Sequence, residues 1–183
     1  GDVARQLSFK QTVLVHTGGA VEIEAIKEAA ADCAILWPVY SIHKANLPAH
    51  RNIPCAWEAS GSKAKRIVAA MGHAITDELF EAKYDQRKWL HLAAVMSNNF
   101  ITHLLAIGEK ICAENNLPFA TLLPIIQQTF GRITHHSPQT QQTGPAMRGD
   151  TATIQEQIAI LADHPEWQKI YQAMTESIQK GRI

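Results

Sequence analysis

Two polar side chains that could do chemistry, His91 and Asn98, lie seven residues apart in a long apolar segment. On an α-helix this spacing is two turns, so both side chains lie on one face. An imidazole titrates near neutral pH and could donate a proton beside a carbonyl or imine, while an amide could hold the substrate oxygen. A solvated polar stripe explains the same residues, although Val95 interrupts it.

The turn after the first β-branched run is a second candidate site. Residues 12–15 predict a short buried strand, and His16, Thr17 and Gly18 follow it directly. Ligands of open α/β sheets bind at the carboxyl ends of strands, which favours a binding role. A tight turn that needs glycine for backbone reasons is the alternative. Trp37 also ends a predicted strand, and we expect it to pack or stack rather than to act as an acid or base.

Thr143 and Arg148 form a third candidate pair, in a connection between two predicted helices. Gly144 and Pro145 fix a turn there, and Asp150 is a good N-cap for the helix that follows. Arg148 lies near that helix N-terminus, where the helix dipole disfavours a cation. A ligand bearing a carboxylate or phosphate, or a partner chain, would explain it. A capping or interface role for these residues stays open.

The composition describes an ordinary globular protein and excludes several partners. The 183 residues carry 17 Lys and Arg against 17 Asp and Glu, which favours neither nucleic acid nor an anionic membrane. We expect no membrane-spanning run and no signal peptide. The three cysteines lie in apolar segments and indicate buried free thiols in a reducing, cytoplasmic compartment. The histidine spacing predicts no metal site.

The chain is predicted to hold two domains. Residues 1–77 alternate strands with helices, which indicates an α/β domain whose sheet is at least partly parallel, and residues 78–183 are predicted to be all helical. Pro124 should kink or offset the helix that contains it. The expected strands are residues 12–15, 33–37, 55–59 and 74–76, and the expected helices are 21–30, 64–71, 85–115, 119–135, 150–162 and 165–180.

The segment 85–115 is predicted to be one long helix of roughly 45 Å. An apolar stripe repeats along it at helical spacing, and further apolar residues fall on its other faces. Residues 97–99, Ser-Asn-Asn, are poor helix formers and predict a helix seam, the wall of a ligand site, or both. A second subunit would bury the excess apolar surface, so we expect a homodimer through the helical domain.

Four motifs carry a family resemblance: VLVHTGGA (13–20), WPVYS (37–41), LHLAAVMSNN (90–99) and QTGPAMRGD (142–150). In this order they resemble Rossmann-like NADP oxidoreductases whose C-terminal part is a domain of unknown function, in the 6-phosphogluconate dehydrogenase C-terminal-like superfamily. The resemblance covers nearly the whole chain. It implies a partial Rossmann-like sheet, then a helical domain with one long helix that lines the cleft between the domains.

The resemblance also implies a cofactor, NADP or NAD, with the turn His16-Thr17-Gly18 beside its nicotinamide. In related dehydrogenases a lysine and an asparagine one turn apart contact the substrate, whereas here Val95 follows His91 by one turn. The sequence contains no GxGxxG, the turn that holds a dinucleotide pyrophosphate. We therefore expect that the N-terminal Gly-rich half is missing and that the cofactor site is incomplete.

These observations predict an NAD(P)-dependent oxidoreductase acting on a small carbonyl or imine substrate. His91 and Asn98 would be catalytic, and Thr143 and Arg148 would contact the substrate. The predicted reaction rests on analogy with proteins of the same fold. Two alternatives stay open: a non-catalytic ligand-binding or regulatory protein, and a helical module whose role is dimerisation.

Overall fold

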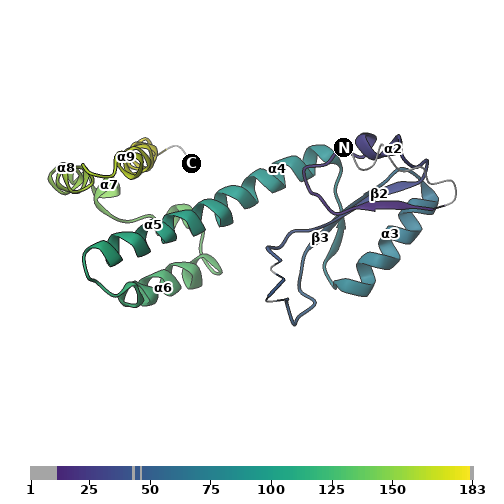
Figure 1. Ribbon diagram of the computed structural model, residues 1–183, viewed down its shortest axis with the longest axis horizontal. Helices are drawn as coiled ribbons and strands as arrows, with labels where there is room; N and C mark the ends of the chain where they lie inside the picture. The colour runs from purple at the N-terminus through teal and green to yellow at the C-terminus, as the bar shows by residue number, and fades with distance from the viewer. Residues whose placement is uncertain (1–11, 43, 46, 182–183) are drawn as a thin grey trace. The chain divides into compact units, whose positions relative to one another are not determined.

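The computed structural model describes residues 12–42, 44, 45 and 47–181 (Figure 1). The chain divides into two compact units, residues 1–102 and 103–183. The first unit is a mixed α/β layer structure that also contains the first part of the long helix, and the second is all helical. The fold is thus a partial Rossmann-like α/β part followed by a helical part, as predicted. The sequence-based domain boundary at 77/78 stays a prediction.

The first unit is built on a four-stranded sheet in the order β1-β2-β3-β4. β1 lies parallel to β2, β2 antiparallel to β3, and β3 parallel to β4, so the predicted partly parallel sheet is confirmed. The expected strand 74–76 is wrong, because helix α3 continues through Ile75 and the last strand forms after it. The strands are β1 (Leu14–His16), β2 (Cys33–Pro38), β3 (Cys55–Ala59) and β4 (Leu79–Glu81).

Helices cover both faces of this sheet. Along β2, Cys33, Ile35 and Trp37 pack on one face with Ile23 and Ile26, which lie at and just after the start of helix α2 (Glu24–Lys27). The intervening residues of β2 pack on the opposite face against α3 (Ser62–Ile75). This alternation is the two-residue period of a strand buried on both sides. The helix expected at 21–30 forms only over the four residues of α2.

The predicted long helix forms as one continuous segment, Tyr84–Glu114. It consists of α4 (Tyr84–Ala94), a π-helical turn η1 (Val95–Asn99) and α5 (Phe100–Glu114). The π turn coincides with the Ser-Asn-Asn run, and the hydroxyl of Ser97 donates to the carbonyl of Ala93 at 2.8 Å. The interruption therefore has a local cause, because these side chains bond to the backbone in competition with the regular helix.

Much of the apolar stripe of this helix is exposed among the described residues. Trp89, Met96 and Phe100 are each more than half exposed. By length and composition alone, Tyr84–Glu114 is able to cross a membrane, so the expectation that no run is long enough is wrong. A buried core helix of a soluble protein passes the same test, whereas none of the apolar window of this helix is buried among the described residues. The middle of the helix carries three polar residues.

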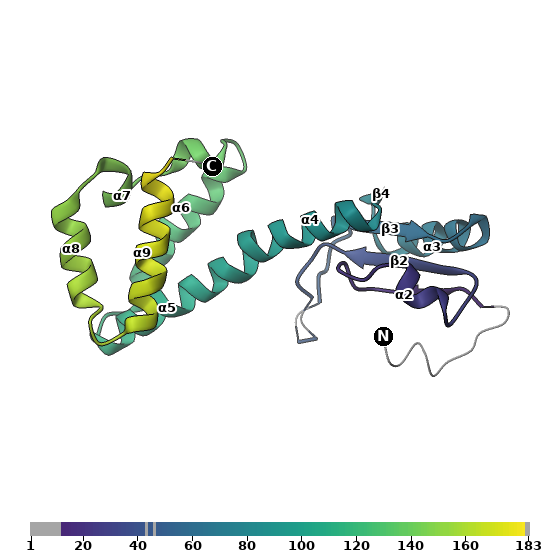
Figure 2. The ribbon, with the colours of Figure 1, turned by 90° about the horizontal axis from the view of Figure 1, so that it is seen from above.

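The second unit contains the remaining helices (Figure 2). Pro124 does not kink a helix interior as expected, because a 3-10 turn precedes it and the proline lies in the first turn of α6, where its missing N–H costs nothing. Asp150 caps α8 and Pro165 begins α9, as predicted. The elements are η2 (Phe119–Leu122), α6 (Leu123–Ile133), η3 (Pro138–Gln141), α7 (Pro145–Arg148), α8 (Thr151–Ile160) and α9 (Pro165–Gln179).

Candidate functional site

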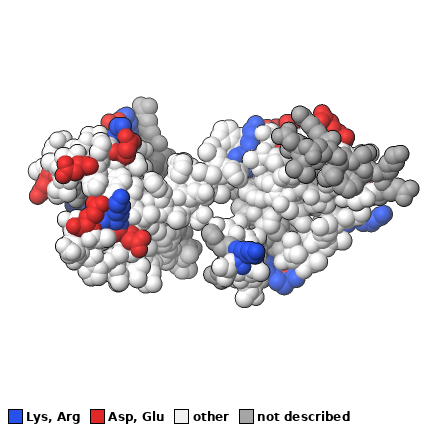
Figure 3. Space-filling model, in the orientation of Figure 1, with Lys and Arg blue, Asp and Glu red and all other residues white. Residues whose placement is uncertain are grey.

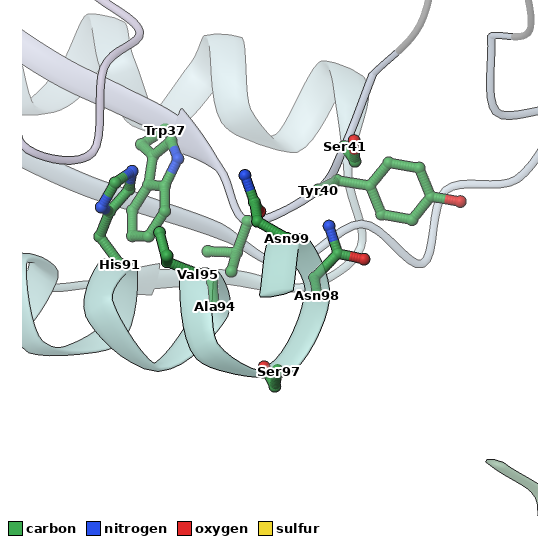
Figure 4. Close-up of a pocket in the computed structure, with 10 residues that line it drawn as sticks. Trp37, Tyr40, Ser41, His91, Ala94, Val95, Ser97, Asn98 and Asn99 are labelled. Carbon is green, nitrogen blue, oxygen red and sulfur yellow. The ribbon is translucent and has the colours of Figure 1, made fainter. Parts of the chain in front are cut away.

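A cavity of about 700 Å³ lies in the first unit, where the end of β2 meets the long helix (Figure 4). β2 and the segment after it contribute two aromatic side chains and a hydroxyl to its wall. The helix contributes an imidazole from α4 and two amides from the π turn η1. The lining residues are Trp37, Val39, Tyr40, Ser41, His91, Ala94, Val95, Ser97, Asn98 and Asn99.

Trp37 is the buried wall of the cavity. It is the penultimate residue of β2 and is only 9% exposed. Its indole lies so close to Gly19 that a Cβ atom built on Gly19 would be 2.3 Å from the ring. The glycine in this turn is therefore needed for the close approach of the ring, and the expectation that Trp37 is a packing residue is confirmed.

His91 faces Trp37 from α4. The two ring centroids are 5.8 Å apart with an interplanar angle of 49°. The His91 side chain is exposed, so it is open to a ligand that enters the cavity. The spacing of seven residues does bring Asn98 to the same cavity, as the helical period predicts. The structure thus joins the two residues that the sequence singles out for chemistry.

The π turn adds a second amide. Asn98 and Asn99 both line the cavity, and Figure 4 shows Ser97 turned away from them. A π turn is wider than an α turn, and such turns occur often at functional sites. Asn99, Tyr40 and Ser41 were not predicted as site residues. The Ser-Asn-Asn run was the signal for Asn99, because it indicated a possible ligand wall.

The chemistry of this wall is neutral. Its polar groups are hydroxyls, amides and one imidazole, and none of its described lining residues is Lys, Arg, Asp or Glu. Amides and hydroxyls both donate and accept hydrogen bonds, so they suit an uncharged polar ligand. The aromatic rings of Trp37 and Tyr40 offer flat surfaces for a planar ring.

The turn His16-Thr17-Gly18 lies outside the set of residues that line this cavity. The N–H of Gly18 donates to Nδ1 of His16 at 2.9 Å, so this imidazole nitrogen closes the turn. The turn is connected to the cavity wall only through Gly19, the next residue, which lies against the ring of Trp37. A structural explanation therefore accounts for His16 and Gly18, and Thr17 is exposed.

Arg87 is a structural anchor that the sequence analysis did not single out. Its side chain has no solvent exposure and forms an ion pair with Glu58 of β3. Its other donors reach the backbone carbonyls of Gly19 at 3.4 Å, Val21 at 2.7 Å and Ala82 at 2.9 Å. It thereby fixes the first turn of α4, and with it His91 one turn later, to the sheet.

Thr143 and Arg148 belong to the second unit, whereas the residues that line the cavity all belong to the first. Thr143 lines an apolar groove of that unit, and Arg148 is exposed. Arg148 does lie two residues before Asp150, the N-cap of α8, as the dipole argument assumed. It also ends the four-residue helix α7, which Gly149 caps in the left-handed region (φ 68°). Its contact with a ligand stays a prediction.

Comparisons with known proteins agree with this architecture. The family model "Domain of unknown function (DUF2520)" matches residues 53–178. A solved structure titled "putative NADP oxidoreductase" from Bacteroides fragilis is 31% identical, with a TM-score of 0.88, and the match covers 92% of this chain but only 65% of that one. A protein of Thermotoga maritima, 23% identical with a TM-score of 0.74 over 98% of this chain and 72% of that one, shares the fold. No curated protein matches.

Proposed function

Because this chain belongs to the DUF2520 family of domains of unknown function, we propose its activity from the cavity itself: an oxidoreductase that uses NADP or NAD and acts on a small carbonyl or imine substrate. The observation that carries the proposal is the joint position of Trp37, His91 and Asn98 on one cavity. The oxidoreductase named among the similar structures supports it. We also assign the helical part to the 6-phosphogluconate dehydrogenase C-terminal-like superfamily and the protein to the reducing cytoplasm, where its three buried free thiols would persist.

Each residue has a role in this proposal. A nicotinamide supplies or accepts the hydride when bound. The indole of Trp37 would border that ring, and the turn His16-Thr17-Gly18 would support the indole through the adjacent Gly19. His91 would donate a proton to the substrate oxygen or nitrogen as hydride reaches the adjacent carbon, and it would recover that proton from solvent because it is exposed. The amide of Asn98 would donate a hydrogen bond to the same substrate atom.

These 183 residues contain the proposed nicotinamide part of the cofactor site but not the turn that binds the pyrophosphate. No GxGxxG is present to cradle a pyrophosphate, so we expect weak binding of the whole dinucleotide to these 183 residues. The chain spans 65% of the length of the Bacteroides fragilis protein, and the activity of a whole protein is part of the proposal. A probe that contains only the nicotinamide half tests the cavity directly.

We therefore propose a titration of the chain with reduced nicotinamide mononucleotide, followed by indole fluorescence. Binding should quench emission saturably at millimolar probe, and the quench should fall in Trp37→Phe. Asn98→Ala should weaken binding about fivefold, the value of one hydrogen bond near 1 kcal/mol. His103→Ala, which removes an exposed histidine of the same helix outside the cavity, is the matched control. No saturable quench, or equal effects of Asn98→Ala and His103→Ala, would contradict the proposal.

A further inference from the structure

The cavity has an aromatic side chain at each end, and the proposed function uses only one of them. Figure 4 shows the rings of Trp37 and Tyr40 at opposite ends of the lining set. His91 faces Trp37, and Asn98 follows it by seven residues on the same helix, which is roughly 10 Å along the helix axis. A nicotinamide beside Trp37 therefore leaves the Tyr40 end of the cavity for another group.

The cavity is large enough for two rings. Its volume is about 700 Å³, whereas a cavity of about 150 Å³ holds a benzene molecule. A nicotinamide beside Trp37 and a second ring beside Tyr40 thus fit together. The reacting atom of the substrate would lie between the two rings, within reach of His91.

The ring of Tyr40 is held from outside the cavity. His50, which is not a lining residue, packs against it edge to face, with the ring centroids 5.9 Å apart and an interplanar angle of 82°. The backbone of the same segment is anchored next to Tyr40, where the N–H of Val39 donates to the carbonyl of Pro54 at 2.7 Å. Tyr40 nevertheless stays 46% exposed. A positioned ring with an open surface favours recognition of a ligand over a purely structural role.

The groups around Tyr40 suit an uncharged, planar partner. Ser41, Asn98 and Asn99 present a hydroxyl and two amides, which donate and accept hydrogen bonds. A carboxylate would lose its hydration here without meeting a cation among the described lining residues. On the face drawn in Figure 3, the charged side chains of the first unit lie towards its edges and leave an uncharged area between them. An aromatic ring, by contrast, gains a stacked or edge-to-face contact with the tyrosine.

We propose that Tyr40 determines specificity at this site, and that the substrate carries an uncharged aromatic or heteroaromatic ring within a few bonds of its reacting carbonyl or imine carbon. The position of the reacting carbon rests on the proposed function, whereas the contact of the ring with Tyr40 does not. Tyr40 acts here by binding the substrate and takes no part in proton or hydride transfer.

Three small ketones test the proposal on the full chain. Benzylacetone carries the ring, its cyclohexyl analogue has a saturated ring instead, and benzylpyruvate adds a carboxylate. Binding is followed by the NMR shifts of the backbone amides of Ser41, Asn98 and Asn99, which report on this cavity alone. We expect saturable shifts with benzylacetone at millimolar concentration, and binding at least about threefold weaker for each of the other two ketones.

Variants of Tyr40 assign the contact. Tyr40→Ala should weaken the binding of benzylacetone about fivefold and remove its advantage over the cyclohexyl analogue, whereas Tyr40→Phe keeps the ring and should bind like the wild type. Phe80→Ala is the matched control, because Phe80 is an aromatic residue of β4 that is 37% exposed and does not line the cavity. Equal binding of the ring and cyclohexyl ketones to the wild type would overturn the proposal. So would tighter binding of benzylpyruvate, or equal effects of Tyr40→Ala and Phe80→Ala.

Reduced nicotinamide mononucleotide separates this inference from the proposed function. Tyr40→Ala should leave the binding of the mononucleotide unchanged, because the nicotinamide lies at the Trp37 end. If benzylacetone binds through Tyr40 and the mononucleotide does not bind, the ring contact is supported and only the proposed function fails. If the mononucleotide binds and benzylacetone does not, the ring contact alone is overturned. An equal loss of both ligands in Tyr40→Ala would show that the two ends are one site, and it would overturn the inference as well.

Discussion

Arg87 and Glu58 form an ion pair in which the arginine side chain is completely buried and the glutamate is 18% exposed. The pair joins α4 to β3, and the remaining donors of Arg87 hold the turn after β1 through two backbone carbonyls. Of these parts, α4 lines the cavity through His91, and β3 pairs with β2, which carries Trp37 to the cavity wall. The ion pair therefore fixes the position of His91 relative to Trp37 without contacting either ring.

Glu58→Gln should be strongly destabilising. It leaves the buried guanidinium without its counter-charge, and breaking one side of a buried pair costs about 3–5 kcal/mol in the free energy of unfolding. Urea denaturation measures this cost. Glu81→Gln is the control, because the Lys65–Glu81 pair is mostly exposed and contributes at most about 1 kcal/mol. Equal losses in the two variants would show that Arg87 is held by its carbonyl contacts alone.

Gly19→Ala should disturb the cavity by displacing the indole of Trp37. The added Cβ would lie 2.3–2.8 Å from three ring atoms, and overpacking of this kind costs about 1–3 kcal/mol in the free energy of unfolding. Urea denaturation and the near-ultraviolet circular dichroism of the indole measure the two effects. In a Trp37→Leu background the same substitution should cost less, because the clash is removed.

Gly61→Ala provides the comparison for that experiment. No heavy atom lies within 4 Å of a Cβ built on Gly61, and its φ of −174° is extended backbone that alanine also adopts. Gly61 is the N-cap of α3, where alanine is less favourable than glycine, so the substitution should cost at most about 1 kcal/mol and should leave the near-ultraviolet signal of the indole unchanged. If Gly19→Ala behaves like Gly61→Ala, the packing of Trp37 on the turn is not what requires glycine there.

The sequence predicted most of the elements because local signals and packing agree. The apolar run at 33–38 alternates onto both sheet faces, and Asp150 and Pro165 begin helices by their own chemistry. The strand expected at 74–76 failed because α3 continues through Ile75, although Ile75 itself is 49% exposed. Local composition alone could not separate a helix end from a short strand.

The site was predictable only where its residues share one helix. His91 and Asn98 follow from the helical period, whereas Tyr40 and Ser41 reach the cavity through tertiary packing that no local pattern encodes. The burial of Arg87 could not be predicted from the sequence for the same reason. Its burial depends on Glu58 and on carbonyls far away in the sequence, so its own neighbours gave no sign of it.

The stability of the first unit should fall at alkaline pH because of two thiols. Burial raises the pKa of Cys33 and of Cys55, with the bond to Ser60 opposing the rise at Cys33. Above about pH 8.5 the unfolded chain loses thiol protons that the folded chain keeps. The contribution of these thiols is therefore complete below that pH and is lost as pH rises towards the raised folded pKa. Cys33→Ala/Cys55→Ala should flatten the decline between pH 8 and 10 in urea denaturation, and an unchanged slope would contradict this.

Asp150 should make the stability of α8 depend on acid. The hydroxyl of Thr153 donates to Oδ2 of Asp150 at 2.8 Å and its backbone N–H to Oδ1 at 3.2 Å, and these bonds hold the pKa of the carboxyl below its ordinary value. The contribution is present above the unfolded pKa near 3.9 and is lost as pH falls through the lower folded pKa. Thermal melts followed by circular dichroism from pH 5 to pH 2.5 measure it.

Two variants of Asp150 separate the charge from the hydrogen bond. Asp150→Asn keeps an acceptor for the Thr153 N–H and is itself a good N-cap, so it should stay close to the wild type at pH 5 but show a flatter acid dependence. Asp150→Ala removes the acceptor as well and should melt lower than Asp150→Asn at every pH. If asparagine and alanine melt together at pH 5, the carboxylate acts through its charge on the helix dipole, and the bond to Thr153 adds little to the stability of α8.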